Sequence, residues 1–471
     1  YKYRGKKYYF NPGTVQNFDD QIKAYNSAGA KVTVILLIPN NTASSVSAMR
    51  YQCPENAKYS SFKTSSKKSS AMFEAMMTFL AGRYSNKESL VMGWILGNEV
   101  NSPGIWNYGG DASMSKYMSN YARAYRIAYN AVKSASKYSN VYISLDHNWN
   151  LDADNDGNKY FTAKSTLDTF YQTVNKYGKV PFKIAFHAYP QGLVDPVFWD
   201  DSMAVNSDQS KIITFRNLSV LTKYVKKQFG KNYTIMLSEQ SFNSTKGEEV
   251  QAAAYVYAYY ISEADSMIES FIYGRHTDNP EEMKDNCYWG LRDASGTKRM
   301  IWDVFQYIDS KDSLKFTKPL LSYTNLKKWE KISGYKKSKY KKMGSIRQKP
   351  VLAEIHTNSS SSVSLFWTKC HYADGYEIIR NGQIIRVIWN MDTCGYTDNN
   401  VKMGESYSYK VRSFKVAPSS RSNKTRTALY SGYSNTQEVT VSAGTVEWNE
   451  KSCEVSGGKI TLAWKSQEGV S

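Results

Sequence analysis

The chain has 471 residues with a hydrophobic fraction of 41% and an aromatic fraction of 14%, enough for two or three folded domains, which excludes a disordered chain. Its formal net charge of +19 favours an anionic partner such as a nucleic acid, a cell-wall polymer or an acidic glycan. However, no nucleic-acid-binding motif accompanies the charge, and no apolar run reaches the roughly 20 residues of a membrane span.

The chain opens at Tyr1 with the segment YKYRGKKYYFNPG, 1–13, which has the pattern of a hairpin. From about residue 15 to 305, amphipathic helices alternate with continuous apolar strands. Strands are predicted at 31–39, 90–98, 141–146, 182–190, 233–240 and 268–274. Helices are predicted at 15–30, 70–84, 115–136, 165–178, 217–230, 247–264 and 299–309.

Continuous apolar strands separated by helices predict a parallel sheet covered on both faces. The spacing is typical of a (β/α)8 barrel, with the predicted strands corresponding to its last six. We therefore expect residues 1–310 to form an α/β TIM barrel that lacks its first strand and most or all of its second. The loop 151–160 imitates half of a calcium loop, but Ala163 stands where the bidentate glutamate would be.

The pattern changes after residue 310. Residues 311–349 are predicted to be a basic linker, because 335–349 carry seven Lys or Arg and no acid. Residues 350–442 alternate polar with aromatic or branched side chains, which predicts an antiparallel β-sandwich. Through Trp367 and the motifs ADGYEIIR, YTD and ESYSYKVRSF, this part resembles a fibronectin type III domain of bacterial extracellular enzymes. The tail, 443–471, is predicted to be the start of a second sandwich that is cut off.

The five cysteines are scattered, with no CxxC spacing, so a disulfide framework or a zinc site is not expected. Cys370 and Cys394 are an alternative disulfide pair. No phosphate-binding loop, serine-hydrolase elbow, zinc-protease or dinucleotide motif occurs, which argues against those chemistries. We expect neither a cofactor nor a metal ion.

Polar and aromatic side chains cluster where the predicted strands end. Because the carboxyl ends of barrel strands meet at one mouth, these residues are predicted to form one site. Two glutamates stand at ends three strands apart, Glu99 in the motif GNEVN and Glu239 in the motif LSEQSF. The other candidates for substrate binding are Asn98, His147, Asn148, His187, Tyr189, Arg275 and Trp289. Trp149 and Trp106 are weaker candidates for sugar stacking.

A carboxylate after the fourth strand, preceded by Asn, and another after the seventh strand resemble the pattern of the clan A glycoside hydrolases. The motifs GNEVN, HAYP and LSEQSF carry this resemblance in that order. It implies a retaining mechanism with Glu99 as general acid/base and Glu239 as nucleophile, Asn98 on the sugar 2-hydroxyl and Tyr189 orienting the nucleophile. We expect a secreted or cell-surface monomer acting on a polysaccharide or glycoconjugate.

Two other functions remain open at this point. A non-catalytic carbohydrate-binding barrel would keep the fold, although it has no reason to retain both glutamates. A cell-surface adhesin would instead use the basic segment 335–349 to bind an anionic polymer.

Overall fold

A computed structural model of the chain describes residues 1–27, 30–41, 44–86, 89–152, 160–309, 313–336, 349–370, 373–416, 428–442, 454–456 and 459–461. The chain divides into two compact units. The first comprises Tyr1–Asn26 and Lys31–Tyr340, and Lys341–Ser471 belongs to the second.

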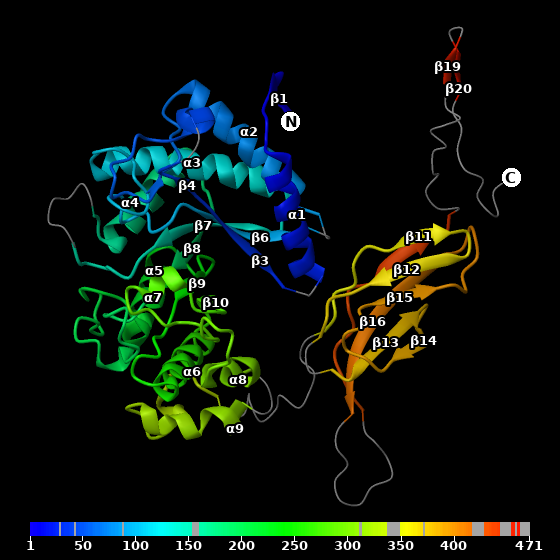
Figure 1. Ribbon diagram of the computed structural model, residues 1–471. Helices are drawn as coiled ribbons and strands as arrows, with labels where there is room; N and C mark the ends of the chain where they lie inside the picture. Colours follow the sequence, from blue (N-terminus) through cyan, green and yellow to red (C-terminus); the bar gives the residue numbers. More distant parts are fainter. Residues whose placement is uncertain are drawn as a thin grey trace, which may run out of the picture. The chain divides into compact units, whose positions relative to one another are not determined.

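The first unit is built on a parallel sheet whose six described strands lie in the order β10-β9-β8-β7-β6-β3 (Figure 1). They span Val32–Leu36 (β3), Val91–Leu96 (β6), Asn140–Leu145 (β7), Lys183–Phe186 (β8), Ile235–Gln240 (β9) and Ile268–Tyr273 (β10). The order in space follows the order in the chain, as in a half-barrel. The six strands expected from the sequence are thus confirmed, and so is their parallel pairing.

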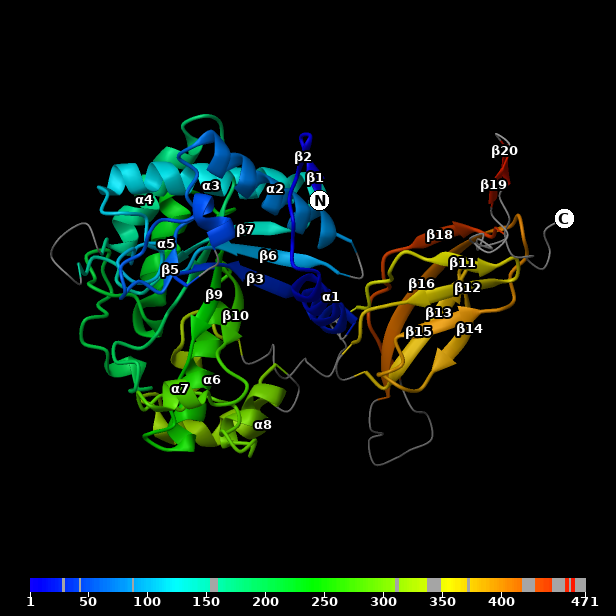
Figure 2. The same cartoon turned by 45° about the horizontal axis from the view of Figure 1, so that its top comes forward.

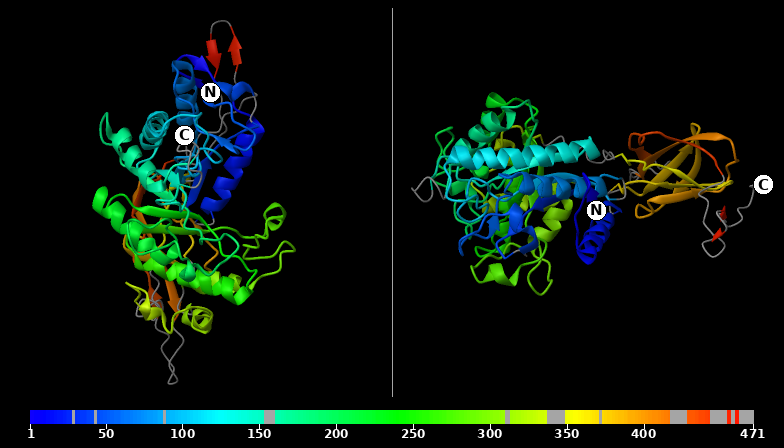
Figure 3. Two further views of the ribbon diagram at one scale, coloured as in Figure 1. Left: turned by 90° about the vertical axis from the view of Figure 1, so that its left-hand side faces the viewer. Right: turned by 90° about the horizontal axis from the view of Figure 1, so that it is seen from above.

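Helices follow most of the strands and cover the sheet. They span Pro12–Ser27 (α1), Lys67–Arg83 (α2), Met114–Ala135 (α3), Ala163–Asn175 (α4), Leu218–Gln228 (α5), Glu248–Ala264 (α6), Pro280–Met283 (α7), Met300–Tyr307 (α8) and Ser313–Thr317 (α9). Helices α2, α3 and α4 lie side by side, and α6 packs against β10 and α8 (Figure 2). Two further views show the same layering (Figure 3).

The remaining elements of the first unit are short. Strands β1 (Lys2–Tyr3) and β2 (Lys6–Lys7) form the antiparallel hairpin expected at the start of the chain, and β4 (Ile38–Pro39) pairs with β5 (Tyr59–Ser60). Short 3-10 helices occur at Ser44–Met49 (η1), Phe198–Asp200 (η2), Phe215–Asn217 (η3), Pro319–Tyr323 (η4) and Trp329–Lys331 (η5).

Buried tyrosines on α3 attach this helix to the strands that carry the site. Tyr121 donates a hydrogen bond to the carbonyl oxygen of Leu96 at 2.8 Å, and Tyr125 donates to that of Val141 at 2.5 Å. Both tyrosines are buried, so each hydroxyl needs such a partner. The last residue of β6 and the start of β7 are therefore held by hydrogen bonds from the helix layer.

The first unit extends beyond residue 310, where the sequence predicted a linker to begin. Tyr260 on α6 exchanges hydrogen bonds with Ser313 at 3.0 Å and Thr317 at 2.8 Å. Leu320 and Trp329 are buried, and the Trp329 ring lies edge-on to Tyr260 at 5.3 Å. The short helices after 310 thus complete the packing around α6. Most of the basic run, 337–348, lies outside the described residues.

The second unit is all-β in its described part, as the alternating pattern predicted. One sheet has the order β11-β12-β15 and the other β14-β13-β16-β17, with β18 also paired to β16. The strands span His356–Ser359 (β11), Ser362–Phe366 (β12), Gly375–Arg380 (β13), Gln383–Ile388 (β14), Gly395–Asp398 (β15), Ser406–Val416 (β16), Ala428–Tyr430 (β17) and Gln437–Thr440 (β18).

Side chains of both sheets of this unit meet in one core that includes Trp367 and Tyr376. The relation to fibronectin type III domains stays a prediction. Of the tail, the described residues form the antiparallel pair β19 (Glu454–Ser456) and β20 (Lys459–Thr461), and a second sandwich there stays a prediction as well.

Candidate active site

Glu99 stands in a turn directly beyond β6. Gly97 has a φ of 75°, and a Cβ at that position would come within 2.6 Å of Asn107 Oδ1, so the strand ends on a glycine for steric reasons. Glu99 itself has a φ of 39°, in the left-handed region that L side chains rarely adopt. Its N–H donates to Ser144 Oγ on β7 at 3.0 Å, which holds the turn. Backbone kept in such a conformation is typical of functional sites.

The imidazole of His187 links the two glutamates. His187 follows β8, and its side chain is 1% exposed. Its Nδ1 lies 2.8 Å from Glu99 Oε1, and its Nε2 lies 3.8 Å from Glu239 Oε2. Ser144 Oγ approaches the same Nε2 at 3.4 Å. One imidazole therefore lies between carboxylates from the ends of β6 and β9.

Burial and charge oppose each other in both members of this pair, and the net effect raises the pKa of each. Burial raises the pKa of Glu99, and it outweighs the lowering effects of the hydrogen bond to His187 and of its positive charge. For His187, burial alone would lower the pKa. The negative charge of Glu239, together with the hydrogen bond and charge of Glu99, outweighs that effect and raises the pKa to about 9. The folded pair thus holds protons at a pH where free side chains would release them.

Glu239 lies in a different environment from Glu99. It is the second-to-last residue of β9, and its side chain is 41% exposed, against 12% for Glu99. Tyr189, which follows β8, donates its hydroxyl to Glu239 Oε1 at 3.1 Å. Burial, followed by the nearby carboxylates, raises the pKa of Tyr189, so its hydroxyl remains a donor. The Tyr189 carbonyl oxygen lies 3.0 Å from His147 Nδ1, which fixes the backbone there.

A buried carboxylate at the end of β7 holds the segment after Glu99. Asp146 accepts hydrogen bonds from Asn101 Nδ2 at 2.6 Å and from Ser102 Oγ at 2.7 Å. It also accepts from the backbone and side-chain amides of Asn148, at 2.8 and 3.0 Å. Both carboxylate oxygens of Asp146 thus accept hydrogen bonds within the fold, so this residue positions the turn that carries Glu99.

Trp289 lies on a long segment after β10, with its ring 5.9 Å from that of Tyr189. The next residue, Gly290, donates its N–H to Asp278 Oδ1 at 2.6 Å, and its carbonyl accepts from Arg299 at 3.1 Å. Asp278 and Arg299 also form a buried ion pair at 2.5 Å. This pair fixes the position of Trp289 beside the carboxylate site.

The structure brings most of the predicted residues to one end of the sheet. Glu99, His187, Tyr189 and Glu239 form one connected cluster, with Trp289 against it. Asn98 is buried beside Glu99, and its Oδ1 has no hydrogen-bond partner among the described residues.

Other predicted residues have structural partners of their own. Asn148 uses its amide on Asp146, and Arg275 pairs with Glu282. Trp149 is not a sugar platform: it is fully buried, and its ring lies edge-on to Tyr224 at 5.1 Å. Trp106 is half-buried and stacks with Tyr59.

Sequence reasoning missed Ser144, Asn101 and Ser102. Ser144 is a polar residue inside the otherwise apolar strand VYISLD, and this break in the apolar pattern could have indicated that its hydroxyl has a specific partner. Asn101 and Ser102 gave no signal, because their partner Asp146 is more than 40 positions away.

Within the described residues, no group of three His, Cys, Asp or Glu is placed to hold a metal ion, and no helix is long and apolar enough to cross a membrane. The calcium-like loop falls mostly in 153–159, outside the described part. Cys53, Cys287, Cys370 and Cys394 are free thiols.

Comparison with known proteins identifies the family. Residues 1–332 match a family of unknown function, DUF5722, and the chain belongs to this family. No curated protein matches the chain in sequence.

The similar solved structures include several glycosidases. A β-xylosidase from Caulobacter crescentus is 12% identical with a TM-score of 0.42, and the match covers 89% of this chain and 65% of the xylosidase. An endo-β-1,4-mannanase from Thermotoga petrophila is 9% identical with a TM-score of 0.36, covering 88% of this chain and 82% of the mannanase.

A calcium-binding mutant of β-glucuronidase 2 from Bacteroides uniformis is 10% identical with a TM-score of 0.37, covering 90% of this chain. The chain spans 40 to 44% of the length of the Bacteroides uniformis β-glucuronidase chains that it matches.

Proposed function

We propose that the protein is a retaining glycoside hydrolase that uses Glu99 as general acid/base and Glu239 as nucleophile. The observation that carries the proposal is the contrast between two carboxyl groups on either side of His187. Glu99 is mostly buried, with 12% of its side chain exposed, and its pKa is raised, whereas Glu239 is 41% exposed and accepts a hydrogen bond from Tyr189. Two carboxyl groups whose environments differ in this way can act as acid and nucleophile in one reaction.

In the first step, a Glu239 oxygen would attack the anomeric carbon while the bond to the leaving oxygen breaks and Glu99 gives that oxygen its proton. In the second step, ionised Glu99 would take a proton from water, whose oxygen attacks the same carbon and releases Glu239. His187 would keep Glu99 in place and stabilise its charge between the steps. Asn98, with a buried amide oxygen that lacks a protein partner, would accept a hydrogen bond from a substrate hydroxyl.

The substrate class under this proposal is a polysaccharide or glycoconjugate, and the enzyme would act outside the cell or at its surface. A non-catalytic binding barrel is the alternative. The Glu99 turn disfavours that alternative, because a left-handed glutamate anchored to Ser144 and His187 is costly to maintain for binding alone.

The experiment compares three variants on a panel of glycosides. Glu239→Ala should abolish turnover of every substrate. In Glu99→Ala, aryl glycosides whose leaving group needs no proton should still glycosylate Glu239. Added azide should restore the second step, the release of the sugar from Glu239, and the product should keep the configuration of the substrate at the anomeric carbon. Glu281→Ala, at a carboxylate whose side chain is 75% exposed, is the matched control and should leave turnover unchanged.

A slow fluorinated substrate should label Glu239 alone. Labelling of another residue, or an active Glu239→Ala variant, would remove the assignment.

A further inference from the structure

The first unit has a hollow whose lining includes none of the residues of the carboxylate site. Its volume is about 640 Å³. Three segments form it: 197–200 after β8, the start of α6 after β9, and 322–325 at the end of η4. Thr245 Oγ1 donates to the carbonyl oxygen of Val194 at 3.1 Å, which ties the first two segments together.

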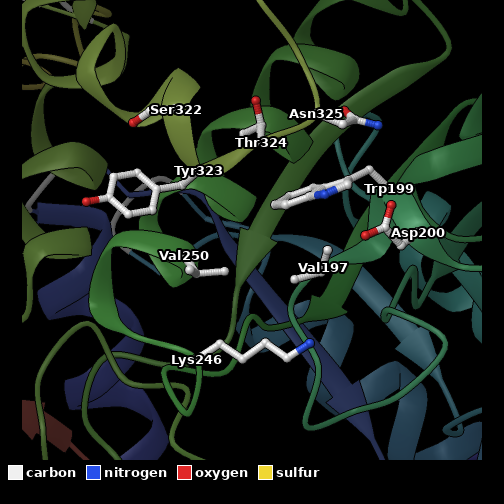
Figure 4. A pocket seen from close by; sticks show the side chains of 9 residues that line it. All are labelled: Val197, Trp199, Asp200, Lys246, Val250, Ser322, Tyr323, Thr324 and Asn325. Carbon is white, nitrogen blue, oxygen red and sulfur yellow. The ribbon is translucent and has the colours of Figure 1, made fainter.

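The walls of the hollow are aromatic and its floor is aliphatic. Figure 4 shows the rings of Trp199 and Tyr323 on opposite sides, with Val197 and Val250 between them. Trp199 is only 8% exposed, because it packs edge-on to Phe198 at 5.3 Å and against a tyrosine of α6. Tyr323 is 45% exposed. One wall is thus rigid, and the other is open to a ligand.

A carboxylate, an amide and two hydroxyl groups, all able to hydrogen-bond to a ligand, lie around these rings. Asp200 and Asn325 are exposed, and within the described part of the chain their side chains have no hydrogen-bond partner. Ser322 and Thr324 add hydroxyls that already donate to backbone carbonyls, at 3.0 and 2.9 Å, and can still accept. A planar carboxylate and a planar amide can each bind two neighbouring hydroxyls of one ligand.

Charge decides between ligand classes. Among the described residues that line the hollow, Lys246 is the one cation, and it is paired with Asp195 at 2.6 Å, whereas Asp200 adds a negative charge. A phosphate or another anion would therefore meet no free positive charge here. A purely apolar ligand would leave the Asp200 carboxylate and the Asn325 amide desolvated without partners. A neutral ring with an apolar face and several hydroxyls satisfies both the aromatic walls and the polar rim.

We propose that this hollow binds a sugar unit of a neutral polysaccharide, as a site separate from the two catalytic glutamates. The proposal rests on the proposed function for the substrate class, since the hollow would hold part of the same kind of polymer. Two of the three segments that form it follow β8 and β9, which are strands of the carboxylate site, so a polymer held there is kept at the catalytic end of the sheet.

Binding can be measured without turnover. In a Glu239→Gln background, electrophoretic retardation would be measured in gels containing xylan, mannan, mixed-linkage β-glucan or starch. Tyr323→Ala and Asp200→Ala should each raise the dissociation constant for the retarding polymer at least about fivefold, the scale of one lost stacking or hydrogen-bonding contact. Tyr177→Ala, at a tyrosine that is 76% exposed and distant in sequence, is the control and should not change the retardation. Melting temperatures would verify that each variant is folded.

The outcomes separate this proposal from the proposed function. If retardation depends on Tyr323 and Asp200 but the unsubstituted protein cleaves none of these polymers, sugar binding in the hollow is supported and the proposed glycosidase function is not. If the protein cleaves one of these polymers but neither substitution changes its retardation, the proposal that the hollow binds a sugar is wrong, whereas the proposed glycosidase function stands. No retardation by any of the four neutral polymers would also overturn it.

Discussion

The raised pKa of His187 should make the protein less stable as the pH rises from 6.5 to 9. The folded-state pKa of His187 is about 9, against 6.5 for the free side chain. Because the folded pKa is raised, the native state binds the proton more tightly than the unfolded state. This contribution to stability is fully present below pH 6.5 and is lost as the pH rises through 9. The raised pKa of Glu99 acts in the same direction at lower pH.

The magnitude follows from the shift. At about 1.4 kcal/mol for each pH unit of displacement, the free energy of unfolding should fall by up to about 3 kcal/mol across this window. Removing the imidazole should remove the dependence. His187→Gln should therefore have a nearly flat profile between pH 6.5 and 9, with an amide that can still contact one of the two carboxylates.

The assay is urea unfolding of the full chain at several pH values, monitored by tryptophan fluorescence. His276→Gln, at an exposed histidine, is the matched control and should keep the slope of the unsubstituted protein. If the unsubstituted protein and His187→Gln lose stability in parallel over this window, the raised pKa of His187 is not the cause of the loss. Stopping at pH 9 avoids titration of the tyrosines.

Three further substitutions test the surroundings of the site. Asp146→Ala should lower the free energy of unfolding by about 2 to 5 kcal/mol, because it leaves the buried donors of Asn101 and Ser102 unpaired. A loss below about 1 kcal/mol in urea unfolding would show that these hydrogen bonds do not hold the segment after Glu99. Tyr189→Phe should lower kcat by roughly 10- to 100-fold on the substrate found by screening, because Glu239 loses its hydrogen-bond donor. Its melting temperature should stay close to that of the unsubstituted protein. An unchanged kcat would show that the Tyr189 hydroxyl does not assist Glu239 in the reaction. Arg299→Ala should lower the free energy of unfolding by about 3 to 5 kcal/mol, because it leaves the Asp278 carboxylate buried without its cation. The double variant Arg299→Ala/Asp278→Ala should be more stable than Arg299→Ala. A double variant that is no more stable than Arg299→Ala would refute this cause.

The order of helices and strands in the first unit was predictable from the sequence, because it is a local property. The apolar run LVMGWIL is short and is followed by Gly97 and Asn98, which favours a buried strand. The segment SKYMSNYARAYRIAYNAVKSAS is long and gathers its apolar side chains on one face at helical spacing, which favours a helix. Once such strands are parallel, their carboxyl ends must share one edge, which is why Glu99 and Glu239 could be assigned to one site. The segment 313–336 escaped prediction because its short helices have no periodicity of their own and form by burying Trp329 and Leu320 against α6.

Tertiary structure alone decided what each site residue touches. The contact of His187 with Glu99 joins positions 88 apart, and no pattern along the chain sets which nitrogen of the ring meets which carboxylate. The register of β6, β7 and β8 places Ser144 under the Glu99 turn and points His187 between the glutamates. The same register buries Trp149 in the core, although its place at a strand end was compatible with a sugar platform. Residue type and spacing determined which side chains could reach the edge of the sheet. Strand register and helix packing determined which of them meet there, because hydrogen bonds require a fit of a few tenths of an ångström that local sequence does not encode.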